Sequence, residues 1–183
     1  VELDVNVRAS SYMYPSIRVN GDQFGCGNRL GATESAECSV KWDTLRFSEE
    51  EFDRRAENLK NRIVEREGCP VEEGEGVTCR AGTTSFWMTW DGRMLPCGMM
   101  QHPVAYPLEV GFDAAWEQIR AKVKQIRTPA KCVGCEYRDL CGACAAVYYT
   151  ETGRFDAVPG YVCRRAEEIV RITQKVYEER KQK

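Results

Sequence analysis

Four thiols fall within one stretch of thirteen residues, Cys132-Val133-Gly134-Cys135-Glu136-Tyr137-Arg138-Asp139-Leu140-Cys141-Gly142-Ala143-Cys144. Two thiols three positions apart, with small residues between them, can turn toward one centre and hold two corners of a tetrahedral ion or cluster. Iron–sulfur clusters and structural zinc ions are both bound in this way. Two such pairs only five residues apart indicate that this stretch is a metal-binding loop.

The chain has ten cysteines among 183 residues. This is about 5% of the chain, below the roughly 8–10% that is typical of small disulfide-rich scaffolds. An even number of cysteines also permits a disulfide framework, so a disulfide-stapled secreted domain is one alternative, and unrelated free thiols are another. The length, the lack of a secretory signal and the C-x2-C spacing favour metal binding.

Composition excludes several function classes. The chain is 43% hydrophobic and 30% charged, which allows a folded core, and its net charge of -2 argues against a general nucleic-acid binder. No apolar run approaches the roughly 18 residues that span a bilayer. We therefore expect a cytoplasmic chain with no nucleic-acid or membrane partner. Because it opens within a strand-like alternation and without Met, we expect an excised part of a larger protein.

The first 68 residues predict a strand, a long loop and a helix. Residues 1–8 alternate like a half-buried strand, and residues 9–32 are rich in turn formers. Ser48 and Glu51 form a capping box for a helix that ends at Gly68. Its apolar face consists of Phe52, Ala56, Leu59 and Ile63. Cys26, Cys38 and His102 lack metal-type spacing, and we expect none of them to be a ligand.

A hairpin is predicted in the middle of the chain, after an acidic glycine-rich linker over residues 72–76. Residues 85–90 alternate with a strand period, and Asp91-Gly92 predicts a two-residue type I′ turn. This turn would let Cys97 approach Cys79. We expect the hairpin aromatics to pack in the core and to shield a nearby cofactor; they are Phe86, Trp87 and Trp90.

Two further helices are predicted. Asp113 would cap the first, which Thr128-Pro129 stops. Cys163 enters the second, and we expect its charged end, residues 178–183, to fray. The inward face of the first helix consists of Trp116, Ile119, Val123 and Ile126. The second helix bears Ala166, Ile169, Val170, Ile172, Val176 and Tyr177.

Seven thiols stand out: Cys79, Cys97, Cys132, Cys135, Cys141, Cys144 and Cys163. Seven thiolates in one small region need bound cations, because thiolates form readily only beside positive charge or metal. Metal binding would supply folding free energy, so we expect the half from Cys97 to Cys163 to be partly unfolded without metal.

Zinc explains these thiols incompletely. Its four-thiolate modules usually separate two C-x2-C pairs by about 15–20 residues. One zinc on the thirteen-residue stretch would be cramped and would leave Cys79, Cys97 and Cys163 unexplained. An arrangement in which neighbouring cysteines serve two centres, as in two-cluster ferredoxins, explains more.

The spacing resembles that of the SPASM domain, the C-terminal auxiliary-cluster region of many radical SAM enzymes that modify peptides or proteins. The resemblance covers about residues 69–170 and rests on the seven cysteines together with Gly92. Tyr14-Pro15 and Arg29-Leu30 resemble, more weakly, the end of the catalytic barrel that precedes such domains. One departure is that Cys141 and Cys144 are separated by two residues where the family usually has three.

The resemblance implies two auxiliary [4Fe–4S] clusters. The first would be bound by Cys79, Cys97 and Cys144, with Cys69 as the best candidate for a fourth ligand in a site that is otherwise open. The second would be bound by Cys132, Cys135, Cys141 and Cys163. The implied fold is α+β: a small cysteine-rich domain over residues 69–170, with a β-hairpin and flanking helices, follows a partial α/β segment with a linking helix over residues 1–68 and precedes a helix end over residues 171–183.

The resemblance also implies a role in a larger enzyme. The C-x3-C-x2-C motif that binds the catalytic cluster does not occur here, so S-adenosylmethionine would be used only by the full-length enzyme. The clusters would transfer electrons and position a peptide or protein substrate beside the catalytic barrel of the parent chain, with a ferredoxin or flavodoxin as electron donor or acceptor. The alternative is a structural zinc module that serves interaction alone; zinc could also replace a cluster during aerobic preparation.

Overall fold

The structure is a computed structural model that describes residues 10, 16–17, 23–24, 29–67, 74 and 76–182. The strand expected over residues 1–8, as well as Cys26 and Cys69, lies outside the described residues. The expected domain boundary at residues 170 and 171 falls inside one continuous helix.

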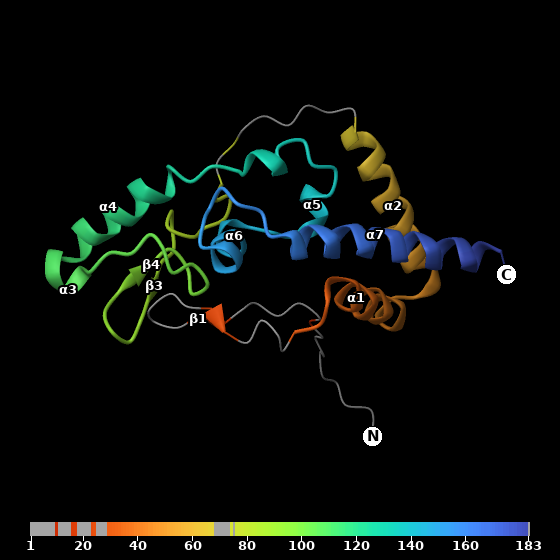
Figure 1. The fold of residues 1–183 in the computed structure, drawn as a ribbon, viewed down its shortest axis with the longest axis horizontal. Helices are drawn as coiled ribbons and strands as arrows, with labels where there is room; N and C mark the ends of the chain where they lie inside the picture. The colour runs from red at the N-terminus through yellow and green to blue at the C-terminus, as the bar shows by residue number, and fades with distance from the viewer. Residues whose placement is uncertain are drawn as a thin grey trace, which may run out of the picture.

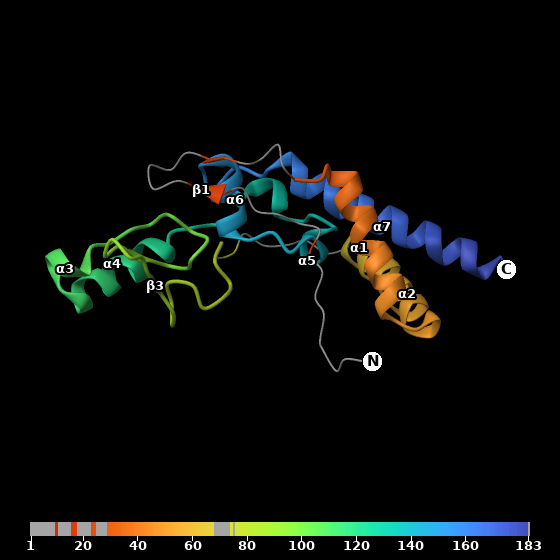
Figure 2. The ribbon, with the colours of Figure 1, turned by 90° about the horizontal axis from the view of Figure 1, so that it is seen from below.

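The fold is α+β, with helices and small antiparallel hairpins (Figures 1 and 2). One end of the elongated molecule carries α3, α4 and the β3–β4 hairpin, the other carries α1, α2 and the C-terminal half of α7, and α5 and α6 lie between them. The elements are β1 (Ser16–Ile17), β2 (Gln23–Phe24), α1 (Ala32–Arg46), α2 (Glu49–Glu67), β3 (Trp87–Met88), β4 (Met94–Leu95), α3 (Pro107–Val110), α4 (Phe112–Val123), the 3-10 helix η2 (Ala130–Cys132), α5 (Arg138–Cys141), α6 (Ala145–Thr152) and α7 (Gly160–Lys181).

Helix α1 was not predicted, because the face that it buries is partly polar. Ser35, Ala36 and Val40 are its buried residues. Arg165 of α7 donates from Nε to the Ser35 hydroxyl and from Nη2 to the Ser39 hydroxyl, both at 2.8 Å. Hydrogen bonds therefore stabilise part of the α1–α7 interface. Because some of the contacting residues of α1 are polar, the sequence of this helix shows no apolar periodicity.

Helix α2 begins with the predicted capping box. The Ser48 N–H donates to Glu51 Oε2 at 3.1 Å, and the Glu51 N–H donates to Ser48 Oγ at 3.3 Å. Phe52 and Ala56 are buried as expected, with exposed fractions of 2% and 0%. Burial of a side chain such as Phe52 contributes roughly 2–3 kcal/mol to folding.

The end of α7 does not fray as expected; the helix continues to Lys181. Its last turn lies against α2, where Arg180 Nη2 is 3.0 Å from Glu49 Oε1 and Lys181 Nζ is 3.4 Å from Asp53 Oδ2. The charged end is helical because its cations meet acidic residues of the neighbouring helix.

The hairpin forms where predicted, but with a different turn. Trp87 pairs with Leu95 and Met88 with Met94. The Thr89 N–H donates to the Arg93 carbonyl at 3.0 Å, which leaves a loop of three residues, Trp90-Asp91-Gly92. Gly92 has φ +83°, and no described non-glycine residue has positive φ. The two-residue type I′ prediction is therefore wrong, because only one loop position takes the left-handed conformation.

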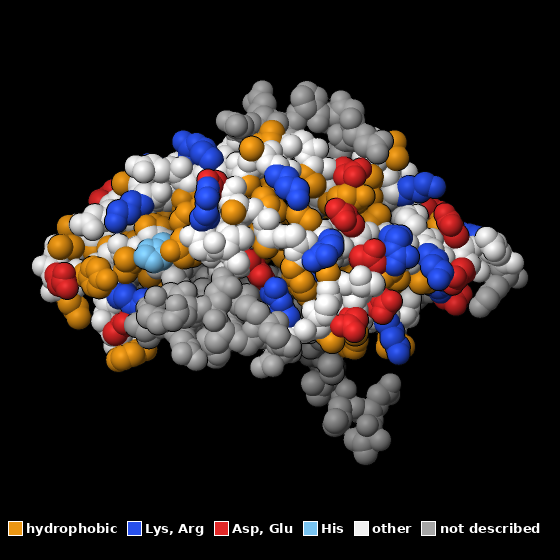
Figure 3. Space-filling view, viewed as in Figure 1, with side chains coloured by type: hydrophobic (Ala, Val, Ile, Leu, Met, Phe, Trp, Pro, Cys, Tyr) orange, Lys and Arg blue, Asp and Glu red, His pale blue; other side chains and the backbone are white. Residues whose placement is uncertain are grey.

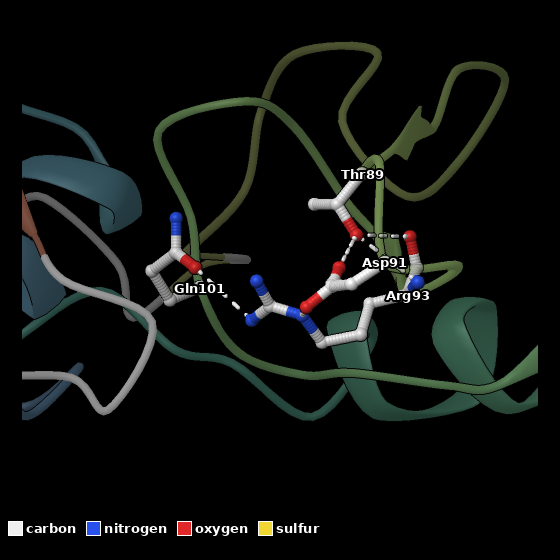
Figure 4. Close-up of polar contacts among 4 residues, drawn as sticks. All are labelled: Thr89, Asp91, Arg93 and Gln101. Atoms are coloured by element: carbon white, nitrogen blue, oxygen red, sulfur yellow. Dashed lines mark hydrogen bonds and ion pairs between the residues drawn. The ribbon is translucent and has the colours of Figure 1, made fainter.

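Polar side chains fasten this turn (Figure 4). The Asp91 carboxylate accepts hydrogen bonds from the Thr89 hydroxyl and, at 2.9 and 3.1 Å, from Arg93 Nε. These bonds lower the pKa of Asp91, with the Thr89 bond as the larger cause. Arg93 Nη1 also lies 3.4 Å from Gln101 Oε1, which ties the turn to the segment after Cys97.

The main core lies between α4, β4 and α6. The predicted inward residues are confirmed, since Ile119 and Val123 of α4 are buried, Ile126 is buried beyond the end of the helix, and Trp116 packs against the same cluster. The helix ends at Val123, before the predicted stop at Thr128-Pro129. Asp113 is not the cap, however; α4 begins at Phe112. Within the described part of the chain, the core cluster consists of Val77, Ala81, Met94, Met100, Ala105, Ala115, Ile119, Val123, Ile126, Ala145 and Ala146.

The hairpin aromatics are not core residues, contrary to expectation. Phe86, Trp87 and Trp90 are 41%, 55% and 90% exposed. Apolar side chains also gather on the surface at the end that carries α3 (Figure 3).

Among the described residues, no helix combines the length and apolarity needed to cross a membrane.

Candidate metal centre

Glycines shape the cysteine loop. Gly134 has φ +72°, which lets the chain reverse between Cys132 and Cys135, and the Cys135 N–H lies 3.4 Å from the Cys132 carbonyl. Gly142 has φ +62° and ends α5 directly after Cys141. Left-handed backbone of this kind costs a residue with a side chain about 1–2 kcal/mol, so both glycines fit their positions.

Four thiols line one small enclosed cavity of about 80 Å³: Cys132, Cys135, Cys141 and Cys163. The first three come from the loop and α5, and Cys163 comes from the first turn of α7. Apolar side chains, including Val158, Val162 and Ala166, complete the lining. The structure therefore brings together the four cysteines that the resemblance assigns to the second cluster.

Two cations and one carboxylate also line this thiol cavity: Lys131, Arg138 and Glu167. Arg138 fastens the loop, because Nη1 donates to the Cys132 carbonyl at 3.3 Å and Nη2 donates to Thr128 Oγ1 at 2.8 Å. Positive charge beside thiols favours the thiolate, the form that binds metal.

Burial opposes the thiolate in the same cavity. It is the main cause that raises the pKa of Cys141 and of Cys163 above the usual value. The neighbouring Cys132 and Cys135 raise both pKa values further, while Lys131 lowers that of Cys163. The half-buried Cys141 and Cys163 therefore favour the thiol until a bound cation stabilises their charge.

Hydrogen bonds reach two of the cavity sulfurs. The Ala143 N–H donates to Cys141 Sγ at 3.4 Å. The Tyr148 hydroxyl lies 3.4 Å from Cys132 Sγ, in a buried contact between α6 and the loop. Sequence reasoning missed the roles of Tyr148 and Arg138. The sequence signal for Tyr148 was its hydroxyl group at the end of the otherwise apolar run Ala145-Ala146-Val147-Tyr148.

A second group of thiols consists of Cys79, Cys97 and Cys144. Burial is the main cause that raises the pKa of Cys97, and the charges of Cys144 and Cys79 raise it further, which places the three within electrostatic range. The backbone N–H groups of Met99 and Met100 bond to Cys97 and act in the opposite direction. Cys79 and Cys144 are exposed, and Cys144 is the residue that precedes α6.

The Trp87 ring lies over the backbone next to Cys97. A Cβ atom added at Gly98 would meet this ring at 3.3 Å. Trp87 therefore covers one side of the Cys97–Gly98 turn, and the glycine permits the close approach. This contact fits the shielding role that was expected for the hairpin aromatics.

The remaining candidates lie apart from these groups. Cys38 is exposed on α1, and the exposed His102 ring packs against Tyr149 with a centroid distance of 5.1 Å. Neither lines the thiol cavity. In the part of the chain that the structure describes, no three or more His, Cys, Asp or Glu side chains are arranged to hold a metal ion directly; the four thiols surround a cavity.

Comparisons with known proteins found a curated relative that matches part of the chain. No family model and no solved structure match it. A curated protein of Oleidesulfovibrio alaskensis, an AdoMet-dependent heme synthase, is 29% identical over 79 residues. The match covers 41% of this chain and 20% of that relative. Because the relative is a radical SAM enzyme, the match indicates a relationship to radical SAM enzymes over part of the chain.

Proposed function

We propose that this chain is an auxiliary iron–sulfur domain of a radical SAM enzyme, and that it binds two [4Fe–4S] clusters. The observation that carries the proposal is the enclosed cavity with Cys132, Cys135, Cys141 and Cys163 in its wall. Four thiols around a small, largely apolar space are the ligand set that a [4Fe–4S] cluster needs. The partial match to a radical SAM enzyme agrees with this assignment.

The three thiols Cys79, Cys97 and Cys144 would hold the other cluster, with Cys69 as its fourth ligand. Under this proposal the cysteine loop joins the two centres, because Cys141 serves one and Cys144 the other. Only Gly142 and Ala143 separate these two thiols. The short spacing is a direct covalent link between the two sites.

When bound, such clusters supply one-electron redox chemistry. The residues of this chain would set their environment. Lys131 and Arg138 would balance negative charge, the Ala143 N–H would donate to Cys141 Sγ and the Tyr148 hydroxyl to Cys132 Sγ, and Trp87 would cover one side of the backbone beside Cys97. The domain would transfer electrons and position a peptide or protein substrate, in the cytoplasm, next to the parent chain's catalytic barrel. A ferredoxin or flavodoxin would be the electron donor or acceptor.

Cysteine variants test the two sites separately. After anaerobic reconstitution, Cys163→Ser and Cys97→Ser should each lose about half of the bound iron, because each removes a ligand of one cluster only. Cys38→Ser is the matched control, since Cys38 is exposed on α1 outside both groups, and it should keep all its iron. Cys69→Ser should change only the spectrum of the cluster that Cys97→Ser removes.

The same samples separate the proposal from its alternatives. A colourless protein with one zinc, after strictly anaerobic preparation, would show a structural zinc module without a redox role. Equal iron loss in Cys38→Ser and Cys163→Ser would contradict the assigned ligand sets.

A further inference from the structure

A groove of about 710 Å³ lies apart from the thiol cavity. It is formed by the segment 102–104, by the end of α4 with residues 125–130, and by the end of α6 with residues 153–156. None of the described cysteines lines it. The groove is therefore a separate feature, although its Pro129-Ala130 wall leads directly into Cys132.

One wall of the groove is a row of three aromatic rings. The Tyr149 and Phe155 centroids are 4.7 Å apart, and the His102 and Tyr149 centroids are 5.1 Å apart. Phe155 packs against the main core and so anchors the row, while His102 at the other end is exposed. Successive rings are tilted by 35° and 52°, so the exposed His102 at the end of the row is the ring on which a flat aromatic ligand can stack.

The charged side chains of the groove have a positive excess. Lys122, Arg127, Arg154 and Asp156 line it. Arg154 and Asp156 neutralise each other, with Nη2 2.7 Å from Oδ2. Arg127 Nη1 donates to the carbonyls of Lys124 and Ile126, which fixes the guanidinium without cancelling its charge. Lys122 and Arg127 therefore leave two positive charges in a chain of net charge -2.

We propose that this groove binds a flat aromatic molecule that carries a phosphate monoester. The ring would stack on the exposed His102 ring, against which Tyr149 packs, and the phosphate would meet Lys122 and Arg127. A phosphate monoester carries about -1.5 to -2 charge at neutral pH, which matches the two uncompensated cations. Charge-assisted hydrogen bonds to phosphate are among the strong ones, and Arg127 presents a planar group suited to them.

Calorimetric titration of the purified full chain under nitrogen tests the proposal with three probes. Flavin mononucleotide combines a flat ring with a phosphate, riboflavin has the ring alone, and inorganic phosphate has the anion alone. Flavin mononucleotide should bind at least about tenfold more tightly than either of the others, because one charge-assisted contact is worth more than about 1.4 kcal/mol.

Variants assign the binding to the groove. Lys122→Gln should weaken flavin mononucleotide about tenfold and leave riboflavin unchanged. Lys124→Gln is the matched control, because it removes the same charge two residues away, at an exposed position outside the groove. His102→Gln should weaken both ring-bearing probes, since it removes an exposed ring and keeps a polar side chain.

Three results would overturn the inference: no binding of flavin mononucleotide at millimolar concentration, equal affinity for flavin mononucleotide and riboflavin, or equal losses in Lys122→Gln and Lys124→Gln. Because none of the thiols that the structure describes lines the groove, these outcomes are independent of which metal those cysteines bind.

Discussion

The hydroxyl oxygen of Tyr148 lies 3.4 Å from the sulfur of Cys132, in a buried contact between α6 and the cysteine loop. The two residues are sixteen positions apart, so the fold brings them together. A hydrogen bond to a ligand sulfur stabilises the more negative, reduced state of a cluster and so raises its reduction potential.

Tyr148→Phe should therefore lower the reduction potential of the cluster proposed for Cys132. A net hydrogen-bond contribution of about 1 kcal/mol corresponds to about 40 mV for one electron. Redox titration followed by electron paramagnetic resonance measures the shift, and the other cluster is an internal reference. Tyr149→Phe is the matched control, because Tyr149 does not line the thiol cavity. Equal potentials in wild type and Tyr148→Phe would contradict a role for this contact.

Glu151 of α6 forms a two-bond ion pair with Arg29, at 2.6 and 3.0 Å. The side chains are only 5% and 13% exposed, and the Arg29 guanidinium also lies 4.0 Å from the centroid of the Tyr161 ring. Glu151→Gln should cost about 3 kcal/mol of unfolding free energy, because it removes the negative charge that the largely buried Arg29 guanidinium meets in this ion pair. Urea denaturation measures this.

The control for that prediction is Glu117→Gln, which breaks the exposed pair Arg120–Glu117. It should change stability by less than about 1 kcal/mol. If the two substitutions lower the free energy of unfolding equally, burial does not determine how much the Arg29–Glu151 ion pair contributes to stability.

Gly82 and Gly153 allow a backbone effect to be separated from packing. Both have positive φ, +66° and +73°. A Cβ at Gly82 would lie 2.5 Å from Val123 Cγ2 in the core, whereas one at Gly153 would meet nothing within 4 Å. Gly153→Ala should cost about 1–2 kcal/mol from the backbone alone, and Gly82→Ala about 1–3 kcal/mol more from overpacking. Thermal unfolding of both variants tests the order; equal losses would contradict it.

Tyr177 of α7 donates a hydrogen bond to Glu57 of α2, and this bond raises the pKa of Tyr177 from 10.0 to about 12. Because the folded-state pKa is the higher one, the stabilisation is fully present below pH 10 and is lost as pH rises toward 12. The difference in denaturation midpoint between wild type and Tyr177→Phe should be constant from pH 8 to 9.5 and should shrink between pH 10 and 12. A constant difference across the whole range would show that this hydrogen bond is not the cause.

Local signals predicted part of the fold. The Ser48–Glu51 capping box and the inward face of α4 were correct, because each is encoded within a few neighbouring residues. Helix α1 was missed because it packs through Ser35 and Ser39 against Arg165, about 130 positions away. The end of α7 was wrong for a similar reason, since Arg180 and Lys181 meet acidic residues of α2.

The candidate site, like the fold, was predictable from the sequence only in part. The family resemblance grouped Cys132, Cys135, Cys141 and Cys163, and these four line one cavity; their binding of iron stays a prediction. Spacing could not identify Tyr148 or Arg138 as neighbours of the thiols, because those contacts depend on how α6 and α5 pack. The hairpin turn was misjudged since Asp91 is held by Thr89 and Arg93 in a three-residue loop.

The iron and sulfide content of the full chain, reconstituted and analysed without oxygen, tests the central claim most directly. Two [4Fe–4S] clusters predict about eight iron atoms and about eight sulfides per chain, with a broad absorbance that bleaches on reduction. About four of each would leave only one cluster and contradict the two-cluster account. A colourless chain with one zinc and no sulfide would contradict the iron–sulfur assignment altogether.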